Sequence, residues 1–336
     1  MKDTFKTASF ISGRAAAGLD PTVSYSATRL RRVVNPAWNF NTITGVQQGS
    51  TSGYMSAGRA SIPAGNYTTV ENFPFATNSG TSYVGALTAA RYQAAGQSST
   101  ASGYTSGGIT NTNVIDKFPF ASNANATDVG DLTQARGYPA GQSSPTSGYN
   151  SGGGSSTNII DKFPFASDAN ATDVGDLTQG RYYAAGQNST DNGYTSGGYA
   201  GPSNVIDKFP FASNANATDV GDLTIKRWGS AGQSSTTNGY VTGGRDGGIP
   251  AVYNIIDKFP FASNANATDV GDLTQGRRSA AGQSSTTNGY TCGGTDSGTP
   301  SDTNVIDKFP FATNANATDV GDINNGKRFG MAGQQV

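Results

Sequence analysis

Recurring carboxylates are the side chains whose type and spacing best suit chemistry in this sequence. Paired carboxylates can act as the acid and base of a glycosidase. One set stands directly before a lysine: Asp116, Asp161, Asp207, Asp257 and Asp307. A second set forms pairs three residues apart: Asp128/Asp131, Asp173/Asp176, Asp219/Asp222, Asp269/Asp272 and Asp319/Asp322. A catalytic pair would be unique to one pocket, whereas these recur in nearly every repeat. We therefore expect them to bond to backbone N–H groups in turns or caps.

Calcium binding is the alternative for the same region. The segment Asn-Ala-Asn-Ala-Thr-Asp at residues 123–128 recurs along the chain and is rich in side-chain oxygens. Such oxygens are the ligands that a hard cation prefers, but the spacing matches no EF-hand loop. We expect no cofactor, and Ca²⁺ stays open as the alternative.

Nucleophilic chemistry has little support. The chain contains no histidine, which removes the commonest general base and metal ligand. Its single cysteine, Cys292, stands where other repeats carry Ser106, Ser151, Ser196 or Thr242, which indicates a small structural residue. We predict that the protein is not an enzyme and has no catalytic residue.

An arginine opens each repeat, with spacings of 45, 45, 46, 50 and 51 residues between Arg91, Arg136, Arg181, Arg227, Arg277 and Arg328. We expect these arginines to pair with the recurring aspartates across junctions between repeats. The residues that follow the arginines vary, so packing does not dictate them. The candidate ligand-binding residues are Tyr92, Tyr138, Tyr182, Tyr183, Trp228, Arg278 and Phe329. Clustered aromatics of this kind suit a sugar-binding or protein-binding face, and the alternative is that they fill the mouth of a channel.

The elements that must position these residues are short strands. Each repeat holds four segments bounded by Gly, Asn, Ser or Pro, as in residues 181–187, 192–198, 204–211 and 218–223. Four short strands in about 45 residues are typical of a β-propeller blade. The sequence therefore predicts an all-β propeller in which Phe-Pro-Phe packs between blades. If the strand after each arginine is innermost, the variable residues after the arginines would cluster at one rim of the channel.

The number of blades follows from counting these segments. The Gly-Tyr strand and Phe-Pro-Phe each occur six times, whereas the last arginine-headed strand, residues 331–336, ends the sequence with no partner after it. If that strand pairs with the first Gly-Tyr strand, six complete blades close the ring. A competing strand at residues 43–48 would instead leave a partial seventh blade.

The order of arginine, Gly-Tyr-x-x-Gly-Gly and Val-Ile-Asp-Lys-Phe resembles the kelch repeat, from about residue 50 onward. The string Asn-Ala-Thr-Asp-Val-Gly-Asp-Leu-Thr, as at residues 216–224, is similar to repeats in tail-fibre-like and other virion proteins of marine bacteriophages. This resemblance implies a structural protein of the tail or capsid, assembled in the host cytoplasm, that displays a kelch-like propeller for host attachment or subunit contacts. Its partners would be other virion proteins, further copies of itself, or a host glycan or protein. The alternative is a free carbohydrate- or protein-binding propeller.

Residues 1–50 do not repeat, and we predict a docking segment there and the propeller at 51–336. The candidate docking residues are Arg29, Arg31, Arg32, Trp38 and Phe40. A formal net charge of −1, with scattered basic residues, argues against a nucleic-acid partner. No apolar run approaches the roughly 18 residues of a membrane span, and residues 1–5 open no signal-peptide core.

Overall fold

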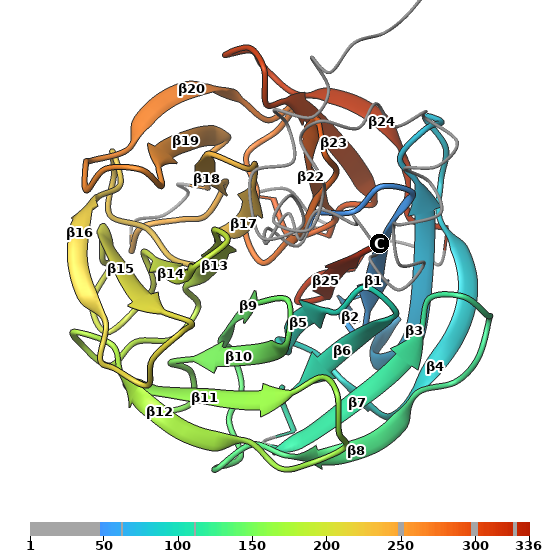
Figure 1. Ribbon diagram of the computed structural model, residues 1–336. Coiled ribbons are helices and arrows are strands. Elements are labelled where there is room, and N and C mark those ends of the chain that lie inside the picture. The colour runs from blue at the N-terminus through green and yellow to red at the C-terminus, as the bar shows by residue number, and fades with distance from the viewer. Residues whose placement is uncertain (1–47, 62, 111, 248–251, 297–301, 325–327) are drawn as a thin grey trace, which may run out of the picture. The chain divides into compact units, whose positions relative to one another are not determined.

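The computed structural model describes residues 48–336 except 62, 111, 248–251, 297–301 and 325–327. The chain divides into two units, residues 1–43 and 44–336, and only the second contains described residues. This described part is built of strands and contains no helix. Its sheets form a ring of six four-stranded antiparallel blades, a six-bladed β-propeller (Figure 1).

Five blades follow the repeat, each with its strands in chain order from the channel outward. Blade 2 is β5 (Ala95–Ser98), β6 (Ser102–Ser106), β7 (Val114–Pro119) and β8 (Thr127–Asp131). Blade 3 is β9 (Ala140–Ser143), β10 (Ser147–Ser151), β11 (Ile159–Pro164) and β12 (Thr172–Asp176). Blade 4 is β13 (Ala185–Asn188), β14 (Asn192–Ser196), β15 (Val205–Pro210) and β16 (Thr218–Asp222). Blade 5 is β17 (Ala231–Ser234), β18 (Asn238–Thr242), β19 (Ile255–Pro260) and β20 (Thr268–Asp272). Blade 6 is β21 (Ala281–Ser284), β22 (Asn288–Cys292), β23 (Val305–Pro310) and β24 (Thr318–Asp322).

Blade 1 joins the two ends of the described chain. It contains β1 (Ser52–Ser56), β3 (Ala64–Pro74), β4 (Ser82–Arg91) and the C-terminal β25 (Ala332–Gln335), and a short β2 (Arg59–Ser61) pairs with β3. β25 pairs with β1 so that Gln334 lies opposite Tyr54. This pairing confirms closure by the C-terminal strand. The seven-blade alternative is wrong, because β25 already occupies the inner edge of β1.

The innermost strands surround a narrow channel, and their glycines make this closeness possible. Neighbouring inner strands approach so closely that a Cβ on Gly186 would lie 2.1 Å from the carbonyl oxygen of Gly141. The same holds around the ring, where a Cβ on Gly96 would lie 2.2 Å from the carbonyl oxygen of Gly333. Only glycine fits such a backbone approach. The strand after each arginine is innermost, which is the condition under which the variable residues after the arginines gather at one rim of the channel.

One aromatic cluster fills each junction between blades. Tyr104 of β6 lies against both rings of the next blade's Phe-Pro-Phe, with centroids 5.5 Å from Phe163 and 4.7 Å from Phe165. At the seam, where blade 6 meets blade 1, Tyr290 packs in the same way on Phe73 and Phe75. Offset and tilted aromatic pairs of this kind add to the free energy gained by burial. The predicted packing of Phe-Pro-Phe between blades is confirmed.

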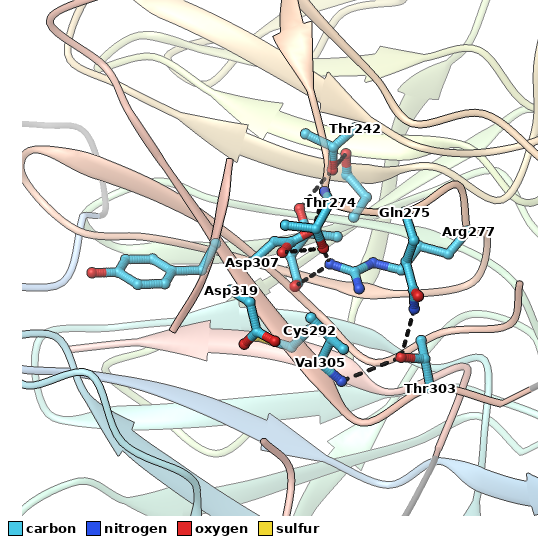
Figure 2. Close-up of polar contacts among 12 residues, drawn as sticks. Thr242, Thr274, Gln275, Arg277, Cys292, Thr303, Val305, Asp307 and Asp319 are labelled. Carbon is cyan, nitrogen blue, oxygen red and sulfur yellow. Dashed lines mark hydrogen bonds and ion pairs between the residues drawn. The ribbon is translucent and has the colours of Figure 1, made fainter. Parts of the chain in front are cut away.

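An arginine and a carboxylate also cross each junction, as predicted. Arg277 lies between blades 5 and 6, and its Nη2 is 2.7 Å from Oδ2 of Asp307 on β23 (Figure 2). Thr274, which directly follows blade 5, donates to the same carboxylate through its backbone N–H and its hydroxyl. Both members of the pair are fully buried. At the seam Arg328 pairs instead with Glu71 on β3.

The two sets of aspartates differ in role. The aspartates before lysine lie within the third strand of each repeated blade and bind arginine and threonine, so the expectation that they form turns or caps is wrong for them. The first aspartate of each pair does bond locally, as expected: Oδ1 of Asp128 accepts the N–H of Gly130 at 3.1 Å. The asparagine loops also have a structural role, since Oδ1 of Asn170 accepts the N–H of Asp131 in the preceding blade.

Candidate ligand-binding rim

One end of the channel is encircled by a closed ring of backbone hydrogen bonds. Its members stand two residues after each arginine: Gln93, Tyr138, Tyr183, Gly229, Ser279 and Gly330. Each N–H donates to the carbonyl oxygen of the next member around the channel, with N···O distances of 2.6–3.0 Å. All six residues have positive φ, between 54° and 70°. This ring fixes the position of the side chains at the channel mouth, here called the rim.

Two tyrosines occupy this ring in a conformation that favours glycine. Tyr138 has φ of 60° and Tyr183 has φ of 57°, while Gly229 and Gly330 occupy equivalent positions in other blades. A left-handed conformation costs a residue with a side chain roughly 1–2 kcal/mol, and bulky residues there are uncommon. Ring closure alone therefore does not require tyrosine at either position.

A second layer of the rim pairs the residue directly after each arginine with the loop that follows the second strand of the same blade. Tyr182 and Tyr199 exchange backbone hydrogen bonds of 3.1 and 2.7 Å. Trp228 pairs in the same way with Arg245, and Phe329 with Arg59. These bridges bring side chains from two separate segments of each blade to the channel mouth.

Aromatic side chains form a continuous row across blades 3, 4 and 5. The Tyr138 and Tyr183 ring centroids lie 4.0 Å apart. Tyr182 contacts Tyr138, Tyr183 and Tyr199 with centroid distances of 5.4–5.8 Å. Trp228 closes the row, 5.0 Å from Tyr183 and 5.7 Å from Tyr199. All five side chains are half-buried, so each keeps part of its surface exposed to solvent.

Two adjoining cavities lie on either side of the Tyr182 and Tyr183 pair. One, of about 310 Å³, is lined by Tyr182, Tyr183, Tyr199, Trp228, Arg245 and Gly247. The other, of about 630 Å³, is lined by Tyr138, Gly154, Ser155, Ser156, Tyr182 and Tyr183. Volumes of this size are typical of small-molecule sites.

The electrostatics of the rim keep its central phenol protonated. Burial, and to a lesser extent Tyr138, raise the pKa of Tyr183, while the positive charge of Arg278 opposes the shift. Arg245 and Arg278 both lie over the ring of Trp228, with Cζ 5.0 and 5.4 Å from its centroid. This part of the rim therefore combines the protonated phenol of Tyr183 with two cations at Trp228.

The seven sequence-predicted candidates all lie at the rim, but in two groups. Tyr138, Tyr182, Tyr183, Trp228 and Arg278 belong to the row described above. Tyr92 and Phe329 form a separate pair with centroids 6.0 Å apart, and Arg59 lies over Tyr92. Whether these residues bind a ligand stays a prediction.

Sequence reasoning missed Tyr199, Arg245 and Arg59 as individual rim residues. The available signal was their place directly after the small residues Ala57-Gly58 or Gly-Gly that end the Gly-Tyr segment. The predicted docking residues Arg29, Arg31, Arg32, Trp38 and Phe40 lie outside the described residues. No helix in the described part of the chain is long and apolar enough to cross a bilayer.

Cys292 takes the place of a serine in the blade interior. Its Sγ donates to Oε1 of Gln283, as Oγ of Ser106 does to Gln97 and Oγ of Ser196 does to Gln187. Burial raises the pKa of the Cys292 thiol, which disfavours the reactive thiolate. Among the residues that the structure describes, no cluster of three or more acidic or cysteine side chains could hold a metal ion.

Comparison with known proteins identifies no relative from which a function could be inferred. No protein-family model matches this sequence, and no curated protein matches it significantly.

Proposed function

We propose that this chain is a non-enzymatic propeller of a virion and that its aromatic rim binds carbohydrate on a host surface. The observation that carries the proposal is the row of aromatic rings over three neighbouring blades, two of them on left-handed backbone at positions that Gln93, Gly229, Ser279 and Gly330 fill elsewhere in the ring. Backbone strain of this kind clusters at functional sites. Its presence at Tyr138 and Tyr183 supports a role for these rings beyond folding.

Carbohydrate suits the chemistry of this row. An aromatic ring offers an apolar face to the C–H groups of a sugar, while phenol and guanidinium groups offer hydrogen bonds to its hydroxyls. The row and its two cavities run across neighbouring blades, so they suit several linked sugar rings better than one isolated ring.

The non-enzymatic part of the proposal is supported by the state of the carboxylates. The aspartates before lysine are buried in ion pairs with arginine. Of the two aspartates that stand three residues apart in each repeat, the first bonds to the backbone of its own turn. The general base that a hydrolase needs would have to be accessible to substrate, and these two sets already have structural partners.

The virion part rests on the sequence resemblance of the repeat, whose string at residues 216–224 recurs along the chain.

The rim is tested by screening the recombinant chain on a glycan array and measuring any hit by calorimetry. We expect Tyr199→Ser to weaken binding about tenfold, because stacking of a planar ligand ring on an aromatic side chain is worth on the order of 1–3 kcal/mol for a nucleic-acid base and we expect a similar loss for a sugar ring. The matched control is Tyr83→Ser, since Tyr83 is 57% exposed and lies on β4 at the outer edge of the propeller. Absence of any glycan binding, or equal loss in both variants, would contradict the proposal.

The virion role needs a separate measurement, namely mass spectrometry of purified phage particles. We expect the chain at an abundance stoichiometric with known structural subunits. Its absence from particles, together with glycan binding by the free chain, would favour the alternative of a free carbohydrate-binding propeller.

A further inference from the structure

Two arginine side chains from neighbouring blades stack on a single indole at the rim. Arg245 follows β18 of blade 5, Arg278 precedes β21 of blade 6, and both guanidinium groups lie within 5.4 Å of the Trp228 ring centroid. The backbone holds this arrangement, because Trp228 pairs with Arg245 and Arg278 pairs with Thr295. Two guanidinium groups thus lie together at one end of the aromatic row.

Placing these two cations together has an energetic cost. Arg278 is half-buried, and burial is the main cause that lowers its pKa, followed by the positive charge of Arg245. Only the phenol of Tyr183 acts in the opposite direction. Partial desolvation strengthens the repulsion between two like charges, so a negative charge bound between or beside them would be stabilised.

Arg278 differs from the other buried arginines of the propeller. The arginine at each of the six junctions has a carboxylate partner, in five cases at 2.7–3.1 Å. Within the described part of the chain, Arg278 forms no ion pair. Its cation can therefore accept a negatively charged group that the described residues do not supply.

Two hydroxyl groups accompany this cation. Ser279 follows Arg278 in the chain, Thr295 pairs with it through the backbone, and each is only 5% exposed. Among the described residues, neither Oγ of Ser279 nor Oγ1 of Thr295 has a hydrogen-bond partner. Buried hydroxyls normally find partners, and both can donate to an oxygen anion.

We infer that Arg278, together with Arg245 and Trp228, forms a subsite for the acidic group of a saccharide, so that the rim binds a carboxylated or sulfated oligosaccharide in preference to a neutral one. The inference rests on the proposed carbohydrate-binding function and specifies acidic oligosaccharides as the class of ligand. The cavity between Tyr199 and Trp228 receives a sugar ring, and Trp228 also borders the arginine pair. Guanidinium groups bind carboxylate and sulfate oxygens through paired N–H donors.

The test compares three probes of equal length by calorimetry: an oligogalacturonate, a sulfated galacto-oligosaccharide and an uncharged galacto-oligosaccharide. At low salt we expect at least one acidic probe to bind about tenfold tighter than the neutral one, and the difference to shrink as added salt screens the charges. Arg278→Gln should remove the preference for the acidic probes, whereas Arg278→Lys should keep part of it. The matched control is Arg59→Gln, which alters a rim arginine over Tyr92.

The possible outcomes distinguish a failure of the acidic subsite from a failure of the proposed carbohydrate binding. Equal affinity for acidic and neutral probes, or a preference that survives Arg278→Gln, overturns the acidic subsite and leaves carbohydrate binding intact. Binding of none of the three probes, together with an empty glycan array, overturns both. Because Arg278 forms no ion pair with the described residues, we expect its variants to keep the wild-type thermal unfolding midpoint; an unchanged midpoint would show that any change in binding is local.

Discussion

The side-chain amide of Gln334 on β25 donates a hydrogen bond of 2.9 Å to the backbone carbonyl oxygen of Tyr104 on β6. The same bond joins Gln97 to Tyr149 at 3.0 Å in the middle of the chain, and Gln283 to Tyr54 at 3.0 Å across the seam. The seam, where the chain closes on itself, is therefore held by the same side-chain contact as an ordinary blade junction.

Loss of this contact should weaken closure. Gln334 Nε2 also lies within hydrogen-bond distance of Ser56 Oγ and Thr105 Oγ1, and all of these groups are buried. We expect Gln334→Ala to lower the free energy of unfolding by about 1–3 kcal/mol, since it leaves buried acceptors without a donor. Urea unfolding measures the effect, with the exposed Gln134→Ala as control. A Gln334→Ala protein as stable as the control would contradict this account of closure.

The arginine–carboxylate pairs should depend on both partners. Arg227 and Asp257 are fully buried with Nη2 and Oδ2 3.1 Å apart, so Arg227→Met or Asp257→Leu alone leaves one buried charge unpaired. We expect each single variant to lose about 3–5 kcal/mol of stability, and the double variant to lose less than the sum. For the exposed pair Lys117 and Asp168, we expect Lys117→Gln to cost no more than about 1 kcal/mol. Additive losses in the double variant would show that the pair is not coupled.

The inner glycines should tolerate no side chain. Gly186→Ala places a Cβ 2.1 Å from the carbonyl oxygen of Gly141, which must move for the ring to close. We expect this variant to unfold at a clearly lower denaturant concentration than Gly65→Ala, because a Cβ on Gly65 meets no atom within 4 Å. Similar midpoints for the two variants would mean that the inner strands lie less close together than described.

Alkaline pH should destabilise the fold through its buried phenols. Burial raises the pKa of the tyrosines at the blade junctions, Tyr104, Tyr149, Tyr194, Tyr240 and Tyr290. The folded state then holds these protons more tightly than the unfolded state. Their contribution to stability is complete below the unfolded pKa of about 10 and is lost as pH rises through the higher folded values. Ultraviolet titration of phenolate checks this: simultaneous ionisation of all 15 tyrosines in the folded protein would contradict it.

The fold was predictable because each blade repeats its own turn residues and core residues. Counting the Gly-Tyr and Phe-Pro-Phe segments gave six blades, and the unpaired strand at residues 331–336 indicated the closure that β25 provides. The buried role of Asp307 was missed, since a lone aspartate between Ile and Lys carries no local sign that a neighbouring blade surrounds it.

The rim was predictable only in part. Variation after each arginine pointed to Tyr182 and Trp228, because packing of the repeat does not require them. Tyr199 and Arg245 come from loops of different length, and only the backbone bridges of the folded blade bring them beside those residues. The left-handed conformation of Tyr183 was not predicted from the sequence. One sign of it was Gly229, the glycine at the equivalent position of the next repeat.

Fluorescence of Trp228 tests the central claim most directly. The chain has two tryptophans, Trp38 and Trp228, so a Trp38→Phe protein reports on the rim alone. We predict a saturable change in intensity or emission maximum when an oligosaccharide that binds by calorimetry is added, with the same dissociation constant by both methods. Calorimetric binding without any change in Trp228 emission would place the ligand elsewhere on the molecule and contradict the aromatic rim as the binding site.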